Sequence, residues 1–493
     1  MSLPAATVVP TGLDDVAAAL ADQLPRTRAW LEELVRVPSI SVDPARVDDV
    51  RRSAEATAEL LRAAGLEDVM LLDLPGDGTN DGTADGEVVH PAVVGSWHRA
   101  GPDAPTVLLY AHHDVQPVGR AEAWSSPPFD PTERGGRLFG RGSADDKAGI
   151  LAHVAAVRAW LTARDGLPVN VIVFVEGEEE IGSPNLGRFL AAHAERLRAD
   201  VLVVADLPNW KVGWPGLTYA LRGMAEATVT VRTLAQPVHS GMWGGPVPDA
   251  LTATTRLLAT LHDEHGEVAV PGLDDDVRPL SDDERARLAA LDADPDELRR
   301  EVRLLDGVRF GGDGSRGPLE QLWMRPTITP VGMDVPPVAD ASNTLLAEVR
   351  TKLSLRLAPG QDPARVLGVL RDHLVASAPF GAEVEVAFGA SNPAWVTEPA
   401  GPAWEAAEAA MTAAYGRAPA AVGCGGSIPF VDELSTALGG VPALLVGVED
   451  PSSNAHGLDE SLHLEDFTKA CLTEAFLLAE LAGRVPPRRD TDG

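Results

Sequence analysis

The chain of 493 residues carries 41 basic and 73 acidic side chains, a formal net charge of −32 at pH 7. This charge argues against nucleic acid or an anionic membrane as a partner, because both are negative and would repel the protein at long range. Two domains are expected, since the length exceeds what one hydrophobic core usually holds. No run of 18 apolar residues predicts a membrane span, and the first residues do not resemble a secretory signal. Only Cys424 and Cys471 are present, so a cytoplasmic location is expected.

The first part of the chain alternates between predicted helices and predicted strands. Helical spacing of apolar residues predicts helices at 13–35, 47–64, 150–163 and 184–196. Apolar runs predict buried strands at 88–97, 106–111, 169–175 and 201–205. Residues 76–86 are expected to form a surface turn and residues 116–137 an irregular loop. The expected fold class is therefore α/β, with a mostly parallel sheet covered by helices on both faces.

The pattern changes after Arg222. Half-buried strands are expected at 225–232, 345–357 and 383–388, and helices at 249–262 and 281–305, the latter as a charged, solvated face. Residues 222–390 are therefore expected to form an inserted α+β domain. Alternation resumes with helices at 404–415 and 467–481 and a strand at 443–448, so residues 1–221 and 391–493 should form one domain together.

The segment at 108–119, LLYAHHDVQPVG, leads from an apolar strand into His112 and Asp114. Successive strand side chains point to opposite faces, so His112 and Asp114 share one face and His113 points away. An imidazole beside a carboxylate can supply a metal ligand together with the group that orients it. The alternative is a surface strand end that happens to carry two polar residues.

Two acidic motifs lie just past a predicted strand or in the loop after one, at the edge where open α/β sheets bind ligands. The sequence GRGSADDKAG at 140–149 places Asp145 and Asp146 at the start of a helix, where an N-cap role is the alternative and is expected for Asp146. The sequence EGEEEIGS at 176–183 contains four glutamates in five positions. Such a run is unfavourable unless cations hold it, although a solvated acidic turn is the alternative.

Two more polar residues lie just past strands. Asp206 ends the apolar run VLVVAD, where burial of an unpaired carboxylate is unfavourable, and His456 lies in the loop EDPSSNAHG. Imidazoles and carboxylates without a thiolate suit Zn, Mn or Co, and this many ligands suit two ions that share a carboxylate. The candidate ligands are His112, Asp145, one or two of the glutamates, Asp206 and His456.

In this order the motifs resemble the dizinc amidohydrolase and peptidase family of carnosinase-like dipeptidases, aminoacylases, succinyl-diaminopimelate desuccinylases and carboxypeptidase G. The motifs that carry the resemblance are HHDVQP, GRGSADDKAG, EGEEEIGS, the strand-end Asp206, HSGMWGG and NAHG. The order of DVQP, W-x-x-P-P-F and GRG-x-x-DDK is closest to the cytosolic dipeptidase branch. The chain differs from the dipeptidase pattern at one place that bears on the substrate. Dipeptidases often have Arg-Glu before Gly-Gly-Ser, whereas this chain has Gly423-Cys424.

The resemblance implies a site for two divalent ions, with zinc expected and Mn or Co as alternatives. It implies that Asp145 bridges the ions, that His112 and Asp206 bind one ion, and that Glu180 and His456 bind the other. It further implies that Asp114 orients His112, that Glu179 is the general base, and that the peptide bond between Asp145 and Asp146 is cis.

The resemblance also gives roles to the inserted domain, which would act as a lid and as the contact surface of a homodimer. His239 would reach into the site of the partner subunit. The residues expected to contact the substrate are Arg356, Asn343, Gly426 and Ser427.

The implied reaction is hydrolysis of a dipeptide amide bond. A water between the two ions would lose its proton to Glu179, attack the amide carbon, and leave Glu179 to protonate the departing amine. An N-acyl amino acid deacylase or desuccinylase is the alternative activity. A non-catalytic, metal-binding dimeric scaffold is the alternative from another class of protein.

Overall fold

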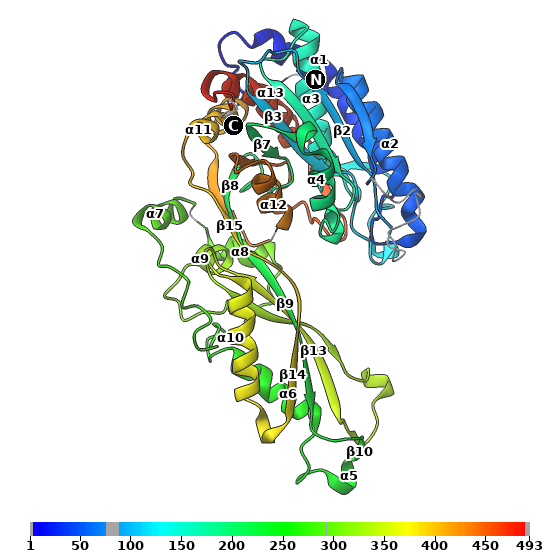
Figure 1. The fold of residues 1–493 in the computed structure, drawn as a ribbon, viewed down its shortest axis with the longest axis vertical. Coiled ribbons are helices and arrows are strands. Elements are labelled where there is room, and N and C mark those ends of the chain that lie inside the picture. The colour runs from blue at the N-terminus through cyan, green and yellow to red at the C-terminus, as the bar shows by residue number, and fades with distance from the viewer. Residues whose placement is uncertain (1–2, 75–87, 292, 427, 489–493) are drawn as a thin grey trace. The chain divides into compact units, whose positions relative to one another are not determined.

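The computed structural model describes residues 3–74, 88–291, 293–426 and 428–488 (Figure 1). The predicted turn at 76–86 and the substrate-binding candidate Ser427 lie outside these residues. The chain divides into two compact units. Unit 1 contains Met1–Tyr219, Thr397–Val422 and Phe430–Gly493, and unit 2 contains Ala220–Val396 and Gly423–Pro429. No helix within the described ranges is long and apolar enough to cross a membrane.

Unit 1 is built on a mixed sheet with a parallel centre. Its strands run in the order β1-β2-β6-β3-β7-β17-β8, and β15, whose residues belong to unit 2, is the last strand of the same sheet. The four central strands β6, β3, β7 and β17 are parallel, and the flanking strands pair antiparallel. The bounds are β1 (Glu67–Leu72), β2 (Ala92–Trp97), β3 (Thr106–His112), β6 (Asn170–Glu176), β7 (Val201–Val204), β8 (Gly216–Leu221), β15 (Trp395–Val396), β16 (Ala420–Cys424), which also pairs with β8, and β17 (Ala443–Leu445). A separate small sheet contains β4 (Thr132–Arg134), β5 (Arg137–Phe139) and β18 (Ser461–His463).

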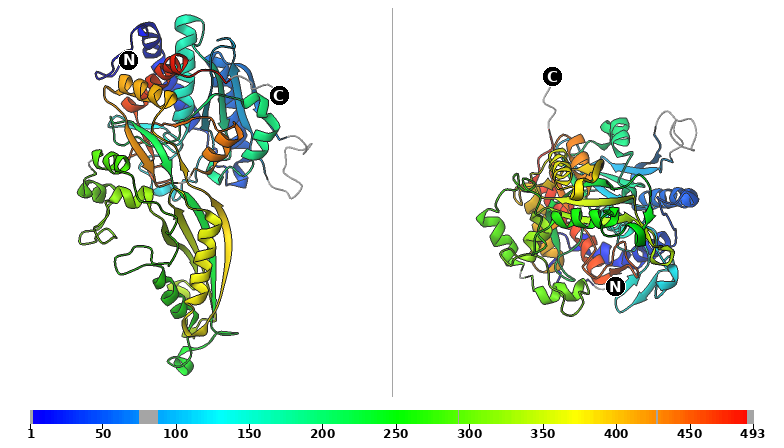
Figure 2. Two further views of the ribbon diagram at one scale, coloured as in Figure 1. Left: turned by 60° about the vertical axis from the view of Figure 1, so that its left-hand side comes forward. Right: turned by 90° about the horizontal axis from the view of Figure 1, so that it is seen from below.

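Helices cover both faces of this sheet, as the sequence predicts. Figure 2 shows α3 and α13 on one side of the strands and α4 on the other. Helix α3 is buried along most of its length because it packs against β3 and also against α1 and α13. The helix predicted at 47–64 is confirmed with these bounds, and it ends at Gly65, which adopts a φ of 98° and whose N–H caps the helix. The helices are α1 (Asp14–Val35), α2 (Val47–Ala64), α3 (Lys147–Arg164), α4 (Leu186–Leu197), α11 (Pro402–Tyr415), α12 (Pro429–Ala437) and α13 (Leu464–Arg484).

Unit 2 is an α+β structure. Its antiparallel sheet has the order β11-β13-β9-β14, formed by β9 (Gly223–Arg232), β11 (Thr327–Asp334), β13 (Glu348–Leu357) and β14 (Glu383–Asn392). Alternate residues of β9 and β13, among them Val229 and Leu353, form a core with Leu257 of one helix and Leu370 of another. The short strands β10 (Val238–His239) and β12 (Thr344–Leu345) pair separately. The helices are α5 (Ser240–Trp243), α6 (Ala250–Leu258), α7 (Asp282–Ala290), α8 (Pro295–Glu301), α9 (Pro318–Met324) and α10 (Pro363–Ala376).

The secondary structure differs from the prediction at several points. The expected helix at 281–305 is two short helices, α7 and α8, because Pro295 starts a new helix that the Asp294 side chain caps. The expected loop at 116–137 includes strand β4. Strand β1 was not predicted, because its residues are mostly half-buried and begin with Glu67 and Asp68, which resemble a surface turn.

Candidate metal centre

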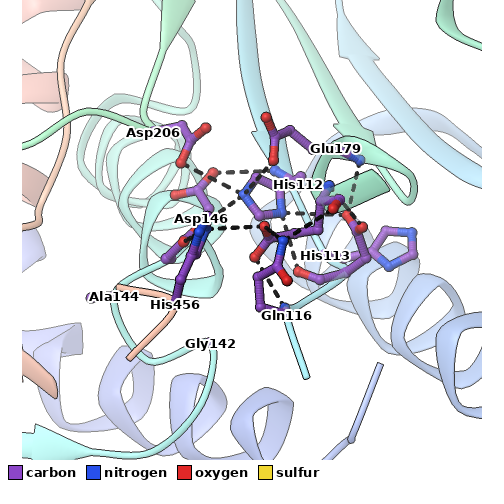
Figure 3. A network of polar contacts seen from close by, with 12 residues as sticks. His112, His113, Gln116, Gly142, Ala144, Asp146, Glu179, Asp206 and His456 are labelled. Atoms are coloured by element: carbon purple, nitrogen blue, oxygen red, sulfur yellow. Dashed lines mark hydrogen bonds and ion pairs between the residues drawn. The ribbon is translucent and has the colours of Figure 1, made fainter. Parts of the chain in front are cut away.

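The candidate ligands are gathered by the parallel strands. His112 is the last residue of β3, Asp206 follows β7, and the glutamate run follows β6. The loop after β17 carries His456, and Asp145 lies just before α3. Because neighbouring parallel strands end at the same edge of a sheet, the side chains that follow β3, β6, β7 and β17 converge there, and Asp145 reaches the same place from the start of α3 (Figure 3). The structure therefore brings together residues that are far apart in the sequence.

The converging side chains form two triplets of potential ligands. One contains His112, Asp145 and Asp206, and the other contains Asp145, Glu180 and His456. Within each triplet the ligand atoms lie within 4.8 Å of one another. Asp145 is common to both, as a carboxylate shared by two ions must be.

The two carboxylate oxygens of Asp145 face different histidines. Its Oδ1 lies 3.0 Å from Nε2 of His112, and its Oδ2 lies 3.0 Å from Nε2 of His456. The same nitrogen of His112 lies 3.6 Å from Oδ1 of Asp206. The same nitrogen of His456 lies 3.1 Å from Oε2 of Glu180. Each oxygen of the shared carboxylate is thus directed toward its own set of partners.

The electrostatics of the cluster fit bound cations. Burial raises the pKa of the Glu180 carboxyl to about 7, and the nearby carboxylate of Asp145 adds to this shift. Burial and the carboxylate of Asp206 raise the pKa of Glu179 well above its usual value, although His112 opposes the shift. So many carboxylates in a largely buried site repel one another unless positive charge lies between them. Imidazoles and carboxylates are ligands that divalent ions accept, so the residues fit a pair of such ions.

Both histidines of the cluster are held by carboxylates. Hydrogen bonds to Asp145 and Glu180 raise the pKa of His456 to about 11. For His112, burial lowers the pKa, but its acidic neighbours, with Asp206 the largest, outweigh burial and raise it well above the usual value. Burial likewise disfavours ionisation of Asp145, but the two histidines lower its pKa below the usual value. The carboxylates thus attract positive charge at two positions, one within each triplet.

Asp114 connects the histidine strand to the glutamate turn. Its Oδ1 lies 3.4 Å from Nδ1 of His112, on the opposite side of the ring from Asp145. Its carboxylate also accepts hydrogen bonds from the backbone N–H groups of Glu179, at 3.2 Å, and Glu180, at 3.1 Å. A fully buried carboxylate in this position can set the orientation of a ligating imidazole.

The glutamate run divides into residues with different surroundings. Glu178 turns away from the cluster and accepts hydrogen bonds from the backbone of His90 and the side chain of Asn185. Glu180 is held by Gln116, whose Nε2 donates to its Oε2 at 2.8 Å and whose backbone N–H donates to its Oε1 at 3.1 Å. Gln116 is not among the site residues that were predicted from the sequence. Its place two residues after Asp114, inside HHDVQP, was the available signal.

Two expectations around the first histidine have different outcomes. His113 points away from the cluster as expected, and its Nε2 lies 2.9 Å from the backbone oxygen of Pro91. The N-cap role expected for the Asp146 side chain is wrong. Asp146 occupies the N-cap position of α3 but forms no capping hydrogen bond, and its Oδ2 accepts from the backbone N–H of His112 at 3.1 Å. The peptide bond between Asp145 and Asp146 is cis, as the resemblance implies.

The remaining candidates that the structure describes belong to unit 2. His239 is exposed in β10, and its Nδ1 accepts a hydrogen bond from the backbone N–H of Gly241 at 3.1 Å. Asn343 lies beside it, because its backbone oxygen accepts from the N–H that follows His239, at 2.9 Å. Arg356 pairs with Met224 between β13 and β9, and the N–H of Gly426 donates to Sγ of Cys424.

Comparison with known proteins agrees with the motifs. Human Beta-Ala-His dipeptidase is 30% identical over 349 residues, which cover 70% of this chain and 68% of that protein. A cysteinylglycine-S-conjugate dipeptidase of Corynebacterium striatum is 37% identical over 382 residues, covering 76% and 81%. The crystal structure of human carnosine dipeptidase 1 matches with a TM-score of 0.83 at 25% identity, covering 96% of this chain and 99% of that one. Residues 108–480, which include every candidate ligand, match peptidase family M20/M25/M40, and the chain therefore belongs to this family.

Proposed function

We propose that this protein is a metal-dependent dipeptidase that hydrolyses the amide bond of dipeptides with two divalent ions. The observation that carries the proposal is the sharing of Asp145 between two ligand triplets at one edge of the sheet. The relatives named above as dipeptidases support dipeptides as the substrate class.

The five ligands would hold the ions in two positions. His112 and Asp206 would bind one ion, Glu180 and His456 the other, and Asp145 both. When bound, such ions polarise an amide carbonyl and make water acidic enough to serve as a nucleophile near neutral pH. Zinc is the proposed metal because the ligands are imidazoles and carboxylates, with Mn and Co as alternatives.

Glu179 is proposed as the general base. It belongs to neither triplet, and its Oε2 lies 3.9 Å from Nε2 of His112, so it borders the ligand cluster. Its side chain is 17% exposed, whereas that of Glu180 is 3% exposed, which leaves Glu179 more accessible to substrate and water. Because burial raises its pKa, Glu179 can retain the proton that it removes from water and then transfer it to the leaving amine.

His239 is proposed to stabilise the oxyanion. Its Nδ1 accepts a hydrogen bond, so the neutral ring carries its proton on Nε2, where it can donate to a negatively charged oxygen. We propose that it does so in the site of a partner subunit of a homodimer. In this proposal, residues 222–390 form the lid and dimerisation domain, and residues 1–221 and 391–493 the catalytic domain.

Substrate recognition is proposed to rest on unit 2. Arg356 would form a bidentate pair with the free carboxylate of the substrate, and Asn343 would hold its main chain. Gly426 and Ser427 would also contact the substrate. Since Cys424 and Cys471 are both free thiols, a cytoplasmic location remains our prediction.

A substrate panel with defined metals tests the proposal. Protein stripped of metal with a chelator would be reloaded with Zn²⁺, Mn²⁺ or Co²⁺ and given dipeptides, the same dipeptides with amidated carboxyl ends, and N-acetyl amino acids. We expect metal-dependent hydrolysis of free dipeptides and much weaker hydrolysis of the amides, because Arg356 would lose its bidentate partner. Preference for N-acetyl amino acids would instead support the deacylase that the Gly423-Cys424 departure allows. Metal binding without any hydrolysis would support a scaffold.

A further inference from the structure

A buried carboxylate links the two segments that carry Asp145 and His456. Glu460 lies four residues after His456, and its side chain is 0% exposed. Its Oε1 accepts hydrogen bonds from the backbone N–H groups of Ala144, at 3.0 Å, and Asp145, at 3.2 Å. Its Oε2 accepts from the N–H of Gly142 at 3.0 Å. The backbone from Gly142 to the shared ligand Asp145 therefore surrounds this carboxylate with hydrogen-bond donors.

A buried arginine completes the connection. The Nη1 of Arg141 donates to Oε2 of Glu460 at 2.7 Å. Its Nη2 donates to the backbone oxygen of Gly457 at 3.0 Å, directly beside His456, and to that of Pro117 at 3.2 Å. The side chain is 2% exposed. Arg141 thus contacts the histidine loop while its own backbone leads into the Asp145 segment.

These contacts have a specific consequence for His456. The imidazole is 58% exposed and the residue has a φ of 62°, so packing and regular secondary structure do little to fix it. Replacing a buried ion pair with apolar side chains often leaves stability unchanged or increased, so a need for stability alone is a weak explanation for the pair. Here the carboxylate instead accepts several backbone hydrogen bonds next to a ligand, which fixes where that ligand lies.

We propose that Glu460 and Arg141 are positioning residues that hold Asp145 and His456 at the separation needed to bind two ions. This inference rests on the proposed function, because it requires a two-ion site. Neither residue needs to contact an ion or the substrate. Glu460 holds the segment of the shared ligand Asp145 and therefore affects both ions. Arg141 also contacts the loop of His456, which would bind only one of the two ions.

The first test is Glu460→Gln, which keeps the size of the side chain and removes its charge. The amide has one acceptor oxygen, so its NH₂ group must face N–H donors of Arg141 and Gly142 or of Ala144 and Asp145. Metal-free protein would be titrated with Zn²⁺ in a calorimeter, and with Co²⁺ while its visible absorption spectrum is recorded. We expect both ions to bind about 10- to 100-fold more weakly.

A second variant distinguishes the effect on the His456 loop from the effect on the Asp145 segment. Arg141→Lys keeps a positive charge for Glu460 but removes the donors to Gly457 and Pro117. We expect the ion held by Glu180 and His456 to bind more weakly, with a much smaller change for the other ion. This variant also decides the question if Glu460→Gln does not fold.

Glu474→Gln is the matched control, because Glu474 is also a buried, paired carboxylate, with Oε2 2.6 Å from Nδ1 of His153. It should lower thermal stability and still bind two Zn²⁺ ions with wild-type affinity. Wild-type affinity for both ions in the Glu460 and Arg141 variants would overturn the inference, as would equal loss in the control. If the wild-type protein itself does not bind two ions, the proposed function fails instead.

Discussion

Adjacent glutamates give the sharpest test of the proposed chemistry. Glu179 and Glu180 differ by one position, yet only Glu180 belongs to a ligand triplet. Substitution of each by Gln removes one negative charge from the same turn and leaves the side-chain volume almost unchanged. The two variants should nevertheless fail for different reasons, because one loses a proton acceptor and the other loses a metal ligand.

For Glu179→Gln, we expect both ions to remain bound and KM to stay near the wild-type value. The amide cannot accept the proton of the attacking water, so kcat should fall by about 10²- to 10⁴-fold or more. This fall corresponds to about 3–5 kcal/mol of transition-state stabilisation. The backbone N–H of Glu179 still donates to Asp114 in this variant, so the orientation of His112 should be preserved.

For Glu180→Gln, we expect loss of metal as well as activity. The amide removes the negative charge beside His456, and its NH₂ group must face one of the two N–H donors of Gln116. Metal content after dialysis, followed by kcat and KM with excess Zn²⁺, would compare the two variants. The assignment of roles is refuted if both variants lose metal equally, or if Glu179→Gln keeps wild-type turnover.

Three further predictions concern the shared ligand, the proposed action of His239 in trans, and a buried ion pair. Asp145→Ala should lose both ions in metal analysis after dialysis, because this carboxylate belongs to both triplets; full occupancy would exclude a bridging role. His239→Ala and Glu179→Ala, each inactive alone, should recover about a quarter of wild-type activity in a statistical mixture of twofold dimers; verified mixed dimers without turnover would exclude action in trans. Burial lowers the pKa of His153, but the carboxylate of Glu474 outweighs burial, so the pKa is raised above 6.5. The stability that this ion pair contributes is therefore present below pH 6.5 and is lost as the pH rises through the raised pKa. Calorimetry should therefore show Glu474→Gln destabilising the protein by about 3–5 kcal/mol below pH 6.5, and by less in alkaline solution; an equal loss at both would contradict the pairing.

The sequence alone was sufficient for the α/β architecture and for the set of candidate ligands. Buried strands such as β3 and β6 are continuous apolar runs, and the polar motifs lie at the ends of such strands, in the loops that follow them, or at the start of a helix. Both signals are local. The convergence of His112 and Asp206 then follows from one rule, that neighbouring parallel strands end at the same edge of the sheet.

Only the tertiary structure could show how these ligands are supported. Arg141 and Glu460 are 319 positions apart and neither lies in a recognisable pair pattern, so their contact appears only when the chain is folded. The same reason explains Asp146, whose carboxylate could have capped its own helix but instead contacts the backbone of His112. A local pattern specifies which groups a residue offers, but the partner of a buried polar group is chosen by whichever donor or acceptor the fold brings beside it.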